Sequence, residues 1–184
     1  VVVPVTNNRT GEITKSQIFV SVLGSSGYTF VHATPSQRQE DFIKSHVLAF
    51  EFYEGVPSIM VPDNLKSAII SNNRKGIVIN ESYAELSRHY SCAIEPARPR
   101  KPQDKAKAEQ GVQAIQRWIL AIFRNRVFFS VDEINQAINP LLDIYNNKVM
   151  KKLNKSRTQL FNENEKQYLQ TLPANRFIYK EFKI

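Results

Sequence analysis

Apolar runs in the first third of the chain predict three β-strands. The runs cover residues 1–5, 16–24 and 28–34, and the turn-forming segments "NNRTGE" and "SSG" separate them. In the second run both alternating sets of side chains are largely apolar, which is typical of a strand covered on both faces. Three strands at this spacing predict an antiparallel meander.

Helical periodicity then alternates with two further strand-like segments. A helix follows Thr34 or Ser36 as the cap, and Gly55 and Pro57 end it. A strand over 58–64, a helix over 80–92 capped by Asn80 or Ser82, and a strand over 92–97 come next. A long helix follows, which Asp104 is expected to cap and whose apolar stripe is Val112, Ile115, Ile119 and Ile122. The last helix covers 130–147, with Ser130 and Glu133 as its capping box and Pro140 as a candidate kink. The loop "NNRKG" joins the fourth strand to the second helix.

This order predicts an α/β fold with a five-stranded mixed sheet, three strands antiparallel and two parallel, between helices. Ribonuclease H-like domains have this order of elements. We assign residues 1–150 to such a core. The tail "LPANRFIYKEFKI" is short, basic and strand-like, so residues 151–184 are interpreted as a C-terminal extension that leads to a following small domain.

Composition narrows the class of protein. The 184 residues are 42% hydrophobic and 23% charged, which is ordinary for a globular domain. The net charge of +8 favours a polyanionic partner such as nucleic acid. The single cysteine, Cys92, excludes an internal disulfide and a cysteine-based zinc cluster, and it fits a reducing cytoplasm. No apolar run has the length of a membrane span, and the start without methionine predicts a piece of a longer protein.

Asp63 is the first candidate for chemistry. It follows a predicted buried strand within "VPDNLKS", and the ends of strands in open α/β sheets are where such folds usually build their sites. The alternative is structural, with Asp63 or Asn64 capping a short helix over "LKSAII".

Glu109 is the second candidate. It lies three residues before Val112 on the apolar stripe, so its side chain is expected to point toward the sheet. Two carboxylates from different elements can bind Mg²⁺ or Mn²⁺ through oxygen ligands. The simpler alternatives are a salt bridge to Lys105 or an exposed position at the edge of the helix face.

Basic residues surround this second acid. Residues 96–126 contain eight Lys or Arg against Asp104 and Glu109. Basic residues around a carboxylate pair suit a phosphodiester substrate, because they attract its negative charge. The alternative interpretation is that these basic residues form the solvated face of a helix. No amphipathic face explains the Pro-rich segment "ARPRKPQDK".

The segments "VPDNLKSAI" and "HYSCAIEPARPRKPQDKAKAEQGVQAIQRWILA" resemble the catalytic core of the IstA-type insertion-sequence transposases. These belong to the DDE superfamily of transposases and retroviral integrases. The segments "QIFVSVLGSSGYTFVHAT" and "AFEFYEGVPSIMVPDN" match the same family, so the resemblance covers almost the whole chain.

The resemblance implies a role for each matching residue. Asp63 matches the second acid of the catalytic triad and Glu109 the third, with the 45 residues 64–108 between them. Both would be ligands of two divalent ions, Mg²⁺ or Mn²⁺, that serve 3′-end processing and strand transfer of DNA. The implied DNA-binding residues are Asn64, Lys66, Arg98, Arg100, Lys101, Lys105 and Lys107.

The resemblance also implies partners and a location. The partners are transposon ends and target DNA, further copies of the transposase on that DNA, and an ATPase helper protein. No membrane partner is expected. The location is the bacterial cytoplasm, at the nucleoid when the protein is bound to DNA.

One motif departs from the family. The first catalytic aspartate belongs to an Asp-aromatic-x-Gly segment of the first strand, and no such segment is present. By its spacing to "TGEI", this aspartate would fall just upstream of Val1. Glu12, Asp41 and Glu95 are not at comparable strand positions, so this fragment is expected to lack one metal ligand and to be inactive as it stands.

Three other functions compete with transposition. A ribonuclease H-like nuclease would share the fold and the acids but would cut without joining. A non-catalytic DNA-binding module would use the basic loop alone. An assembly role would bury Trp118, Phe123, Phe128 and Phe129 against a partner, although core packing is the favoured interpretation of these aromatic residues. His46 is interpreted as a core or surface histidine without a zinc partner, and Cys92 as a small buried filler.

Overall fold

The computed structural model describes residues 2–62, 68–73, 76–95 and 102–180, with only the backbone described for residues 69, 71–73, 76–77 and 102–108. The chain divides into two compact units. Unit 1 comprises Val1–Ser36 and Ala106–Gln167, and unit 2 comprises Gln37–Lys105 and Tyr168–Ile184. The domain boundary expected at residue 150 stays a prediction.

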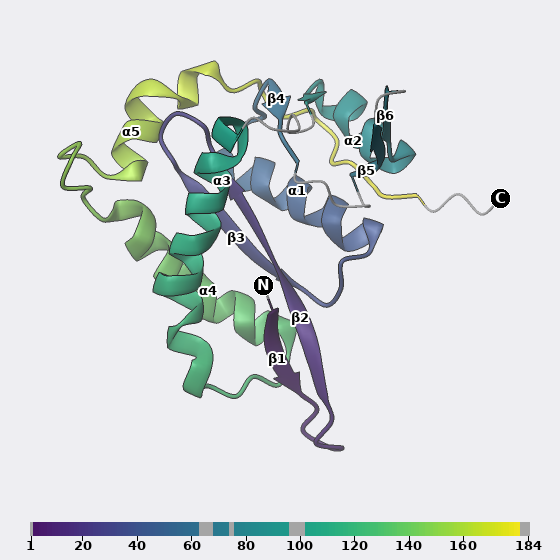
Figure 1. Cartoon of the computed structure of the whole chain (residues 1–184), viewed down its shortest axis with the longest axis vertical. Coiled ribbons are helices and arrows are strands. Elements are labelled where there is room, and N and C mark those ends of the chain that lie inside the picture. The colour runs from purple at the N-terminus through teal and green to yellow at the C-terminus, as the bar shows by residue number, and fades with distance from the viewer. Residues whose placement is uncertain (1, 63–67, 74–75, 96–101, 181–184) are drawn as a thin grey trace. The chain divides into compact units, whose positions relative to one another are not determined.

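Unit 1 contains the predicted antiparallel meander (Figure 1). Strands β1 (Val2–Thr6), β2 (Ile13–Val22) and β3 (Thr29–Thr34) pair in the order β1-β2-β3. Gly11, with a φ of 72°, allows the β1–β2 turn, and Gly27, with a φ of 71°, allows the β2–β3 turn, because both need left-handed backbone.

The β2–β3 turn is fixed to the end of unit 1. Both carboxylate oxygens of Glu165 accept backbone N–H groups, from Ser25 and from Ser26, each at 2.9 Å. Tyr28 stacks on Phe161, with the ring centroids 4.5 Å apart. Residues about 140 positions apart therefore hold the hairpin tip in place.

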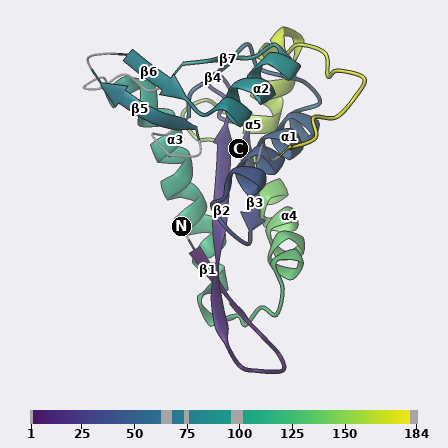
Figure 2. The ribbon, with the colours of Figure 1, turned by 90° about the vertical axis from the view of Figure 1, so that its right-hand side faces the viewer.

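Helix α4 (Val131–Asn147) covers the outer edge of β3 (Figures 1 and 2). The Asn135 amide accepts the Ala33 N–H at 2.7 Å and donates to the Ala33 carbonyl at 3.0 Å. The Asn146 amide does the same for Thr29, at 3.1 and 2.8 Å. Two side-chain amides thus replace the ladder hydrogen bonds that a neighbouring strand would form.

Helix α3 (Pro102–Ile115) approaches the sheet at Gly111. A Cβ on Gly111 would lie 2.5 Å from Val22 Cγ2, so only glycine permits this approach of α3 to β2. The helix continues as a π-helical turn, η1 (Gln116–Leu120), and a 3₁₀ turn, η2 (Ile122–Asn125). The helix begins at Pro102, which places Asp104 inside the first turn and not at the predicted capping position.

The π-helical turn changes the predicted apolar stripe. Ile115 and Ile119 are fully buried as expected, but Ile122 is 52% exposed and Phe123 is 4% exposed. A π turn takes more residues per turn than an α-helix, so the buried position moves by one residue. Phe128 is buried as well, while Trp118 and Phe129 are about half exposed. The aromatic set is therefore only partly core.

Two helices of unit 1 have side-chain caps. Ser130 Oγ accepts the Glu133 N–H at 3.1 Å and caps α4, as predicted. The Glu133 carboxylate accepts the Phe129 N–H at 2.8 Å, one residue earlier than in a standard capping box. Helix α5 (Arg157–Asn164) begins with a full capping box formed by Ser156 and Gln159. The α4 helix continues through Pro140.

Unit 2 packs two helices against two short parallel strands. Helix α1 (Gln39–Tyr53) and helix α2 (Glu81–Tyr90) accompany β4 (Ile59–Met60) and β7 (Ala93–Ile94), which pair in parallel. Asn80 caps α2, accepting the Ser82 N–H at 3.0 Å. Arg38 stands at the N-cap position of α1 and makes no side-chain capping hydrogen bond. The expectation that Thr34 or Ser36 caps this helix is therefore wrong.

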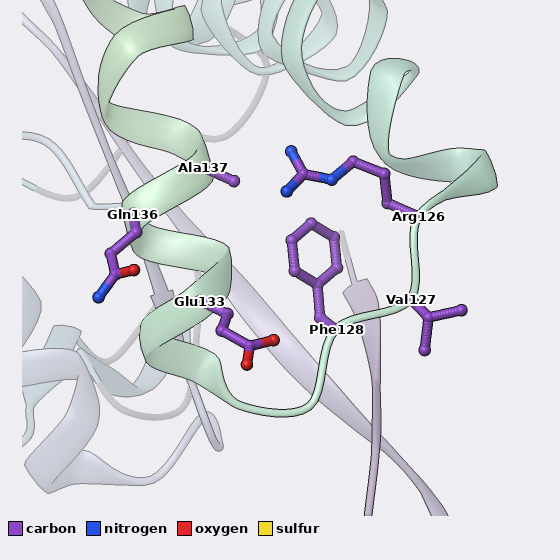
Figure 3. Close-up of a pocket in the computed structure, with 6 residues that line it drawn as sticks. All are labelled: Arg126, Val127, Phe128, Glu133, Gln136 and Ala137. Atoms are coloured by element: carbon purple, nitrogen blue, oxygen red, sulfur yellow. The ribbon is translucent and has the colours of Figure 1, made fainter. Parts of the chain in front are cut away.

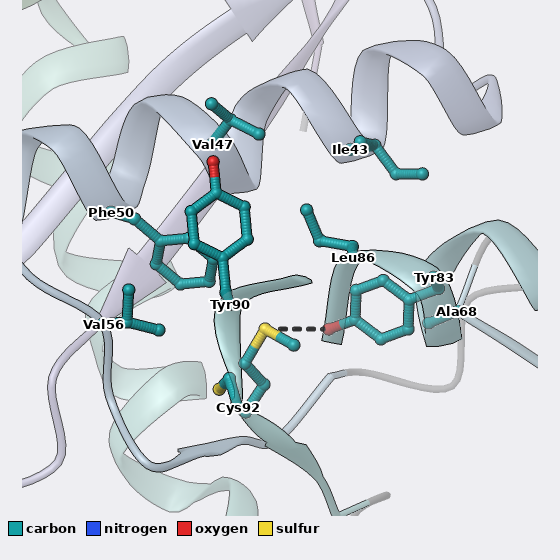
Figure 4. Close-up of a cluster of buried hydrophobic side chains, with 10 residues drawn as sticks. Ile43, Val47, Phe50, Val56, Ala68, Tyr83, Leu86, Tyr90 and Cys92 are labelled. Carbon is teal, nitrogen blue, oxygen red and sulfur yellow. Dashed lines mark hydrogen bonds between the residues drawn. The ribbon is translucent and has the colours of Figure 1, made fainter. Parts of the chain in front are cut away.

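The core of unit 2 combines residues from both helices, from β4 and from the connecting segments (Figure 4). Its buried members are Ile43, Val47, Phe50, Val56, Met60, Ala68, Tyr83, Leu86, Tyr90 and Cys92. Burial raises the pKa of the Cys92 thiol to about 12, which makes it an inert apolar filler as predicted.

A hairpin in unit 2 was not expected from the sequence. Strands β5 (Ile69–Asn73) and β6 (Gly76–Ile79) pair antiparallel, as Figure 2 shows. Ile69 and Ile70 are therefore in a strand and not in a helix over "LKSAII". The "NNRKG" segment contributes to both strands of the hairpin.

From Tyr168 onward the chain belongs to unit 2 again. Following the 3₁₀ turn η3 (Lys166–Tyr168), Gln170 and Val56 exchange backbone hydrogen bonds at 2.8 and 2.9 Å. Arg176 Nε lies 2.8 Å from a Glu51 carboxylate oxygen. Up to Lys180 this tail contains no regular strand, and its strand-like character is limited to the bridge at Gln170.

Candidate active site

The parallel pair β4–β7 leads into the two segments that carry most of the predicted site. Ile59 pairs with Ala93 and Met60 with Ile94, and the Glu95 N–H donates to the Met60 carbonyl at 2.9 Å. Because the strands are parallel, their carboxyl ends lie at one edge. Pro62 and Glu95, the last described residues before positions 63–67 and 96–101, therefore follow strands that end at the same edge.

Most predicted site residues lie outside the described residues. This applies to Asp63, Asn64, Lys66, Arg98, Arg100 and Lys101, and to the side chains of Lys105 and Lys107, whose backbone is part of α3. The pairing of Asp63 with Glu109 and the DNA-binding set stay predictions.

Glu109 is the predicted site residue whose side chain is described. It is exposed on α3, two residues before the buried Gly111 that contacts β2. The expectation that it points into the sheet is wrong, because Gly111 and Ile115 occupy the buried face. An exposed carboxylate is accessible to a divalent cation and to a phosphodiester, and it needs no cation to offset burial. No cluster of three or more metal-ligating side chains occurs within the described ranges.

A buried polar chain supports the strand that precedes Asp63. His46 Nδ1 is 2.9 Å from the Phe42 carbonyl, and His46 Nε2 is 3.3 Å from the Tyr83 hydroxyl. That hydroxyl donates to Met60 Sδ at 3.6 Å (Figure 4). Burial lowers the pKa of His46 to about 4 and raises that of Tyr83. Both are neutral near pH 7, so this chain positions β4 and carries no charge for catalysis.

A pocket in unit 1 is lined by none of the predicted site residues (Figure 3). Its volume is about 280 Å³, and Arg126, Val127, Phe128, Glu133, Gln136 and Ala137 line it. The Arg126 guanidinium lies 4.9 Å from the Phe128 ring centroid, and the Glu133 carboxylate binds the Phe129 N–H. One stacked cation and one engaged acid do not form a metal site.

Sequence reasoning missed the residues that fix the supporting frame. Asn135 and Asn146 bind the edge of β3, and Gly111 sets the distance between α3 and β2. The sequence signals for these roles were two asparagines on one helix and a glycine inside another helix. Both patterns also occur in helices that do not contact a sheet, so neither signal was specific.

No helix in the described part of the chain combines the length and apolar character needed to cross a membrane.

Solved structures similar to this chain define the class of fold. One is a simian T-cell lymphotropic virus intasome in complex with the PP2A regulatory subunit B56 gamma, with a TM-score of 0.65, 15% identity, and coverage of 99% of this chain and 58% of that one. Another is the HTLV-2 integrase catalytic core domain in complex with magnesium, with a TM-score of 0.60, 18% identity, and coverage of 87% and 91%. The chain has a ribonuclease H-like fold of the integrase catalytic core type.

Curated relatives confirm the resemblance to insertion-sequence transposases. A predicted transposase of Sinorhizobium fredii is 45% identical over 98% of this chain and 35% of its own length. The predicted transposase of insertion sequence IS1162 of Pseudomonas fluorescens is 41% identical over 98% of this chain and 32% of its own length. The transposase of IS21 of Pseudomonas aeruginosa is 29% identical over 95% of this chain.

These relatives are homologous to the chain over almost all its residues, although the chain spans only about a third of the length of the first two. No protein-family model matches the chain.

Proposed function

We propose that the chain is the catalytic core of a DNA transposase that performs metal-dependent 3′-end processing and strand transfer. The observation that carries this proposal is the 45% identity to a predicted transposase across 98% of the chain. An integrase-type fold accompanies that identity.

Asp63 and Glu109 are the proposed ligands of Mg²⁺ or Mn²⁺. Aspartate and glutamate offer the hard oxygen donors that these ions prefer, and the Glu109 side chain is exposed. When bound, the ions supply positive charge for the attacking and leaving oxygens of phosphoryl transfer. The residues of this chain bind the ions and orient the DNA.

The basic residues next to the acids are proposed to bind the DNA backbone. They are Lys66, Arg98, Arg100, Lys101, Lys105 and Lys107, with Asn64 beside Asp63. Further copies of the protein and an ATPase helper are the proposed protein partners. A cytoplasmic location, at the nucleoid when the protein is bound to DNA, follows from this substrate.

Residues 1–184 alone are proposed to be inactive. It carries two of the three acids that the family motif requires, and fewer carboxylates lower both the charge and the number of ligands available to the cation.

The activity test uses a protein extended at its N-terminus by a strand that carries an Asp-aromatic-x-Gly segment. We expect this protein to join labelled transposon-end DNA to a target in Mn²⁺, while Asp63→Asn and Glu109→Gln abolish joining. Nicked product without joined product would favour the nuclease, and activity unaffected by either substitution would contradict the assignment of the acids.

Metal binding is tested on residues 1–184 by isothermal titration with Mn²⁺. We expect weak binding that Asp63→Asn and Glu109→Gln each remove, because both carboxylates are ligands. Glu85→Gln, on α2, is the matched control and should bind Mn²⁺ like the unsubstituted chain. Equal binding by all variants would place the cation elsewhere.

A further inference from the structure

The connection between α4 and α5 in unit 1 is strongly basic. Between Asp143 and Glu163 the sequence contains five Lys or Arg and no Asp or Glu. These cations, which we call the α4–α5 basic loop, are Lys148, Lys151, Lys152, Lys155 and Arg157. The loop lies where α4 ends and α5 begins (Figure 1), and none of its residues belongs to the proposed site.

Backbone hydrogen bonds give the loop a defined shape. The Met150 N–H donates to the Lys155 carbonyl at 3.0 Å, and the Asn154 N–H donates to the Met150 carbonyl at 2.8 Å. Asn154 has a φ of 51°, a left-handed conformation that asparagine accepts better than most residues. The cations are therefore held on a folded turn, which lowers the entropy cost of binding a ligand with several of them.

Aromatic rings hold the two outer cations. Lys148 Nζ lies 3.4 Å from the centroid of the Trp118 ring. The Arg157 guanidinium lies 4.0 Å from the centroid of the Tyr145 ring, and it donates to the Tyr145 carbonyl at 3.2 Å. These cation–π contacts hold the two cationic groups in place at either end of the loop.

The middle of the loop carries charge that no described residue neutralises. Lys155 forms an ion pair with Glu163. Lys151 and Lys152 are exposed and form no ion pair with any residue in the described ranges. Adjacent like charges repel one another, and an anion with closely spaced charges relieves that repulsion.

We propose that the α4–α5 basic loop binds the phosphate backbone of duplex DNA as a contact surface separate from the Asp63–Glu109 site. Phosphates regularly spaced along a duplex can engage several cations of the loop at once. This inference rests on the proposed function, since it takes DNA as the macromolecular substrate.

The test measures binding of residues 1–184 to a short fluorescent DNA duplex by anisotropy over a range of NaCl concentrations. The double substitution Lys151→Gln/Lys152→Gln is compared with Lys15→Gln/Lys44→Gln, which removes two exposed lysines from β2 and α1. We expect the first variant to reduce the slope of log affinity against log salt by about 2, near 0.9 for each lost phosphate contact. The control variant keeps the original slope.

The outcomes separate this inference from the proposed function. If the unsubstituted chain shows no salt-dependent binding to DNA, both fail. If it binds DNA and both variants keep its slope, or both lose it equally, the loop has no specific role and only this inference is overturned. Binding to anionic lipid vesicles with none to DNA would assign the loop to a membrane surface and overturn it as well. Far-UV circular dichroism verifies that each variant is folded.

Discussion

Asn135 and Asn146 show how single side chains complete a sheet edge. Each amide donates to one strand carbonyl and accepts one strand N–H, so four backbone groups of β3 are satisfied. They are eleven positions apart on α4, about 16 Å at 1.5 Å per residue. The four residue-to-residue steps from Thr29 to Ala33 span about 13 Å in a strand. The two spacings are close enough for one helix to serve both ends of the strand.

Replacing Asn146 by alanine should therefore destabilise the protein by about 2–4 kcal/mol, because it leaves a buried N–H and a buried carbonyl of Thr29 unpaired. Urea unfolding followed by circular dichroism measures the change. Asn139→Ala, at an exposed position of the same helix, is the control and should stay within about 0.5 kcal/mol of the unsubstituted protein. Equal stabilities for the two variants would mean that the Asn146 amide does not stabilise the edge of β3.

At the scale of elements, α3 depends on one close contact with the sheet. Gly111 allows α3 to approach β2 at Val22, and valine cannot easily rotate away because its χ1 angle is restricted. The following π-helical turn then moves the buried position from Ile122 to Phe123. Helix placement thus depends on a glycine and on a local irregularity.

The Gly111→Ala substitution should cost about 1–3 kcal/mol through overpacking against Val22. Adding Val22→Ala should recover part of this loss, because it removes the methyl group that lies 2.5 Å from the new Cβ. Thermal or urea unfolding of both single variants and the double variant gives the coupling energy. Strict additivity would mean that the two residues do not clash.

The π-helical turn leads to a second test on the same helix. Phe123→Ala should destabilise by about 3–5 kcal/mol because Phe123 is buried, while Ile122→Ala, at an exposed position, should change the stability by less than about 0.5 kcal/mol. Chemical denaturation measures both variants. A larger loss of stability for Ile122→Ala than for Phe123→Ala would mean that Ile122 is the buried residue, as in the predicted α-helical stripe.

At the scale of the whole molecule, charge and burial together determine how folding responds to pH. The chain carries a net charge of +8 at pH 7, so acidification adds positive charge to an already basic protein. His46 adds a specific contribution, because burial lowers its folded-state pKa from 6.5 to about 4. The unfolded chain therefore binds a proton at this residue more readily than the folded chain.

Folding stability should fall as the pH drops from about 6.5 toward 4, with His46 contributing a loss on the order of 2–3 kcal/mol. The sign follows from the lowered pKa, since protonation favours the unfolded state. Urea unfolding over this pH range compares the protein with His46→Gln, whose amide does not titrate. A stability difference that is constant with pH would contradict the burial of a neutral imidazole.

The sequence was informative where periodicity and a specific motif coincide. The meander, the helices α1 to α4, the parallel pair β4–β7 and the caps Asn80 and Ser130 follow from short-range patterns, whereas α5 was not predicted. The transposase resemblance follows from the segments around Asp63 and Glu109.

Features set by tertiary contacts could not be predicted in this way. The π turn depends on packing, and the exposure of Glu109 depends on which face of α3 meets the sheet at Gly111. The hairpin β5–β6 is different, because the apolar runs on either side of "NNRKG" are a local strand signal that the loop prediction missed.

The covered edge of β3 limits how the protein can associate. An open strand edge is a template on which another chain can add a strand, and such addition leads to swapped dimers or fibrils. Here any incoming strand would have to displace the paired amides of Asn135 and Asn146 together with α4. Assembly through strand addition is thus blocked at this edge of the sheet.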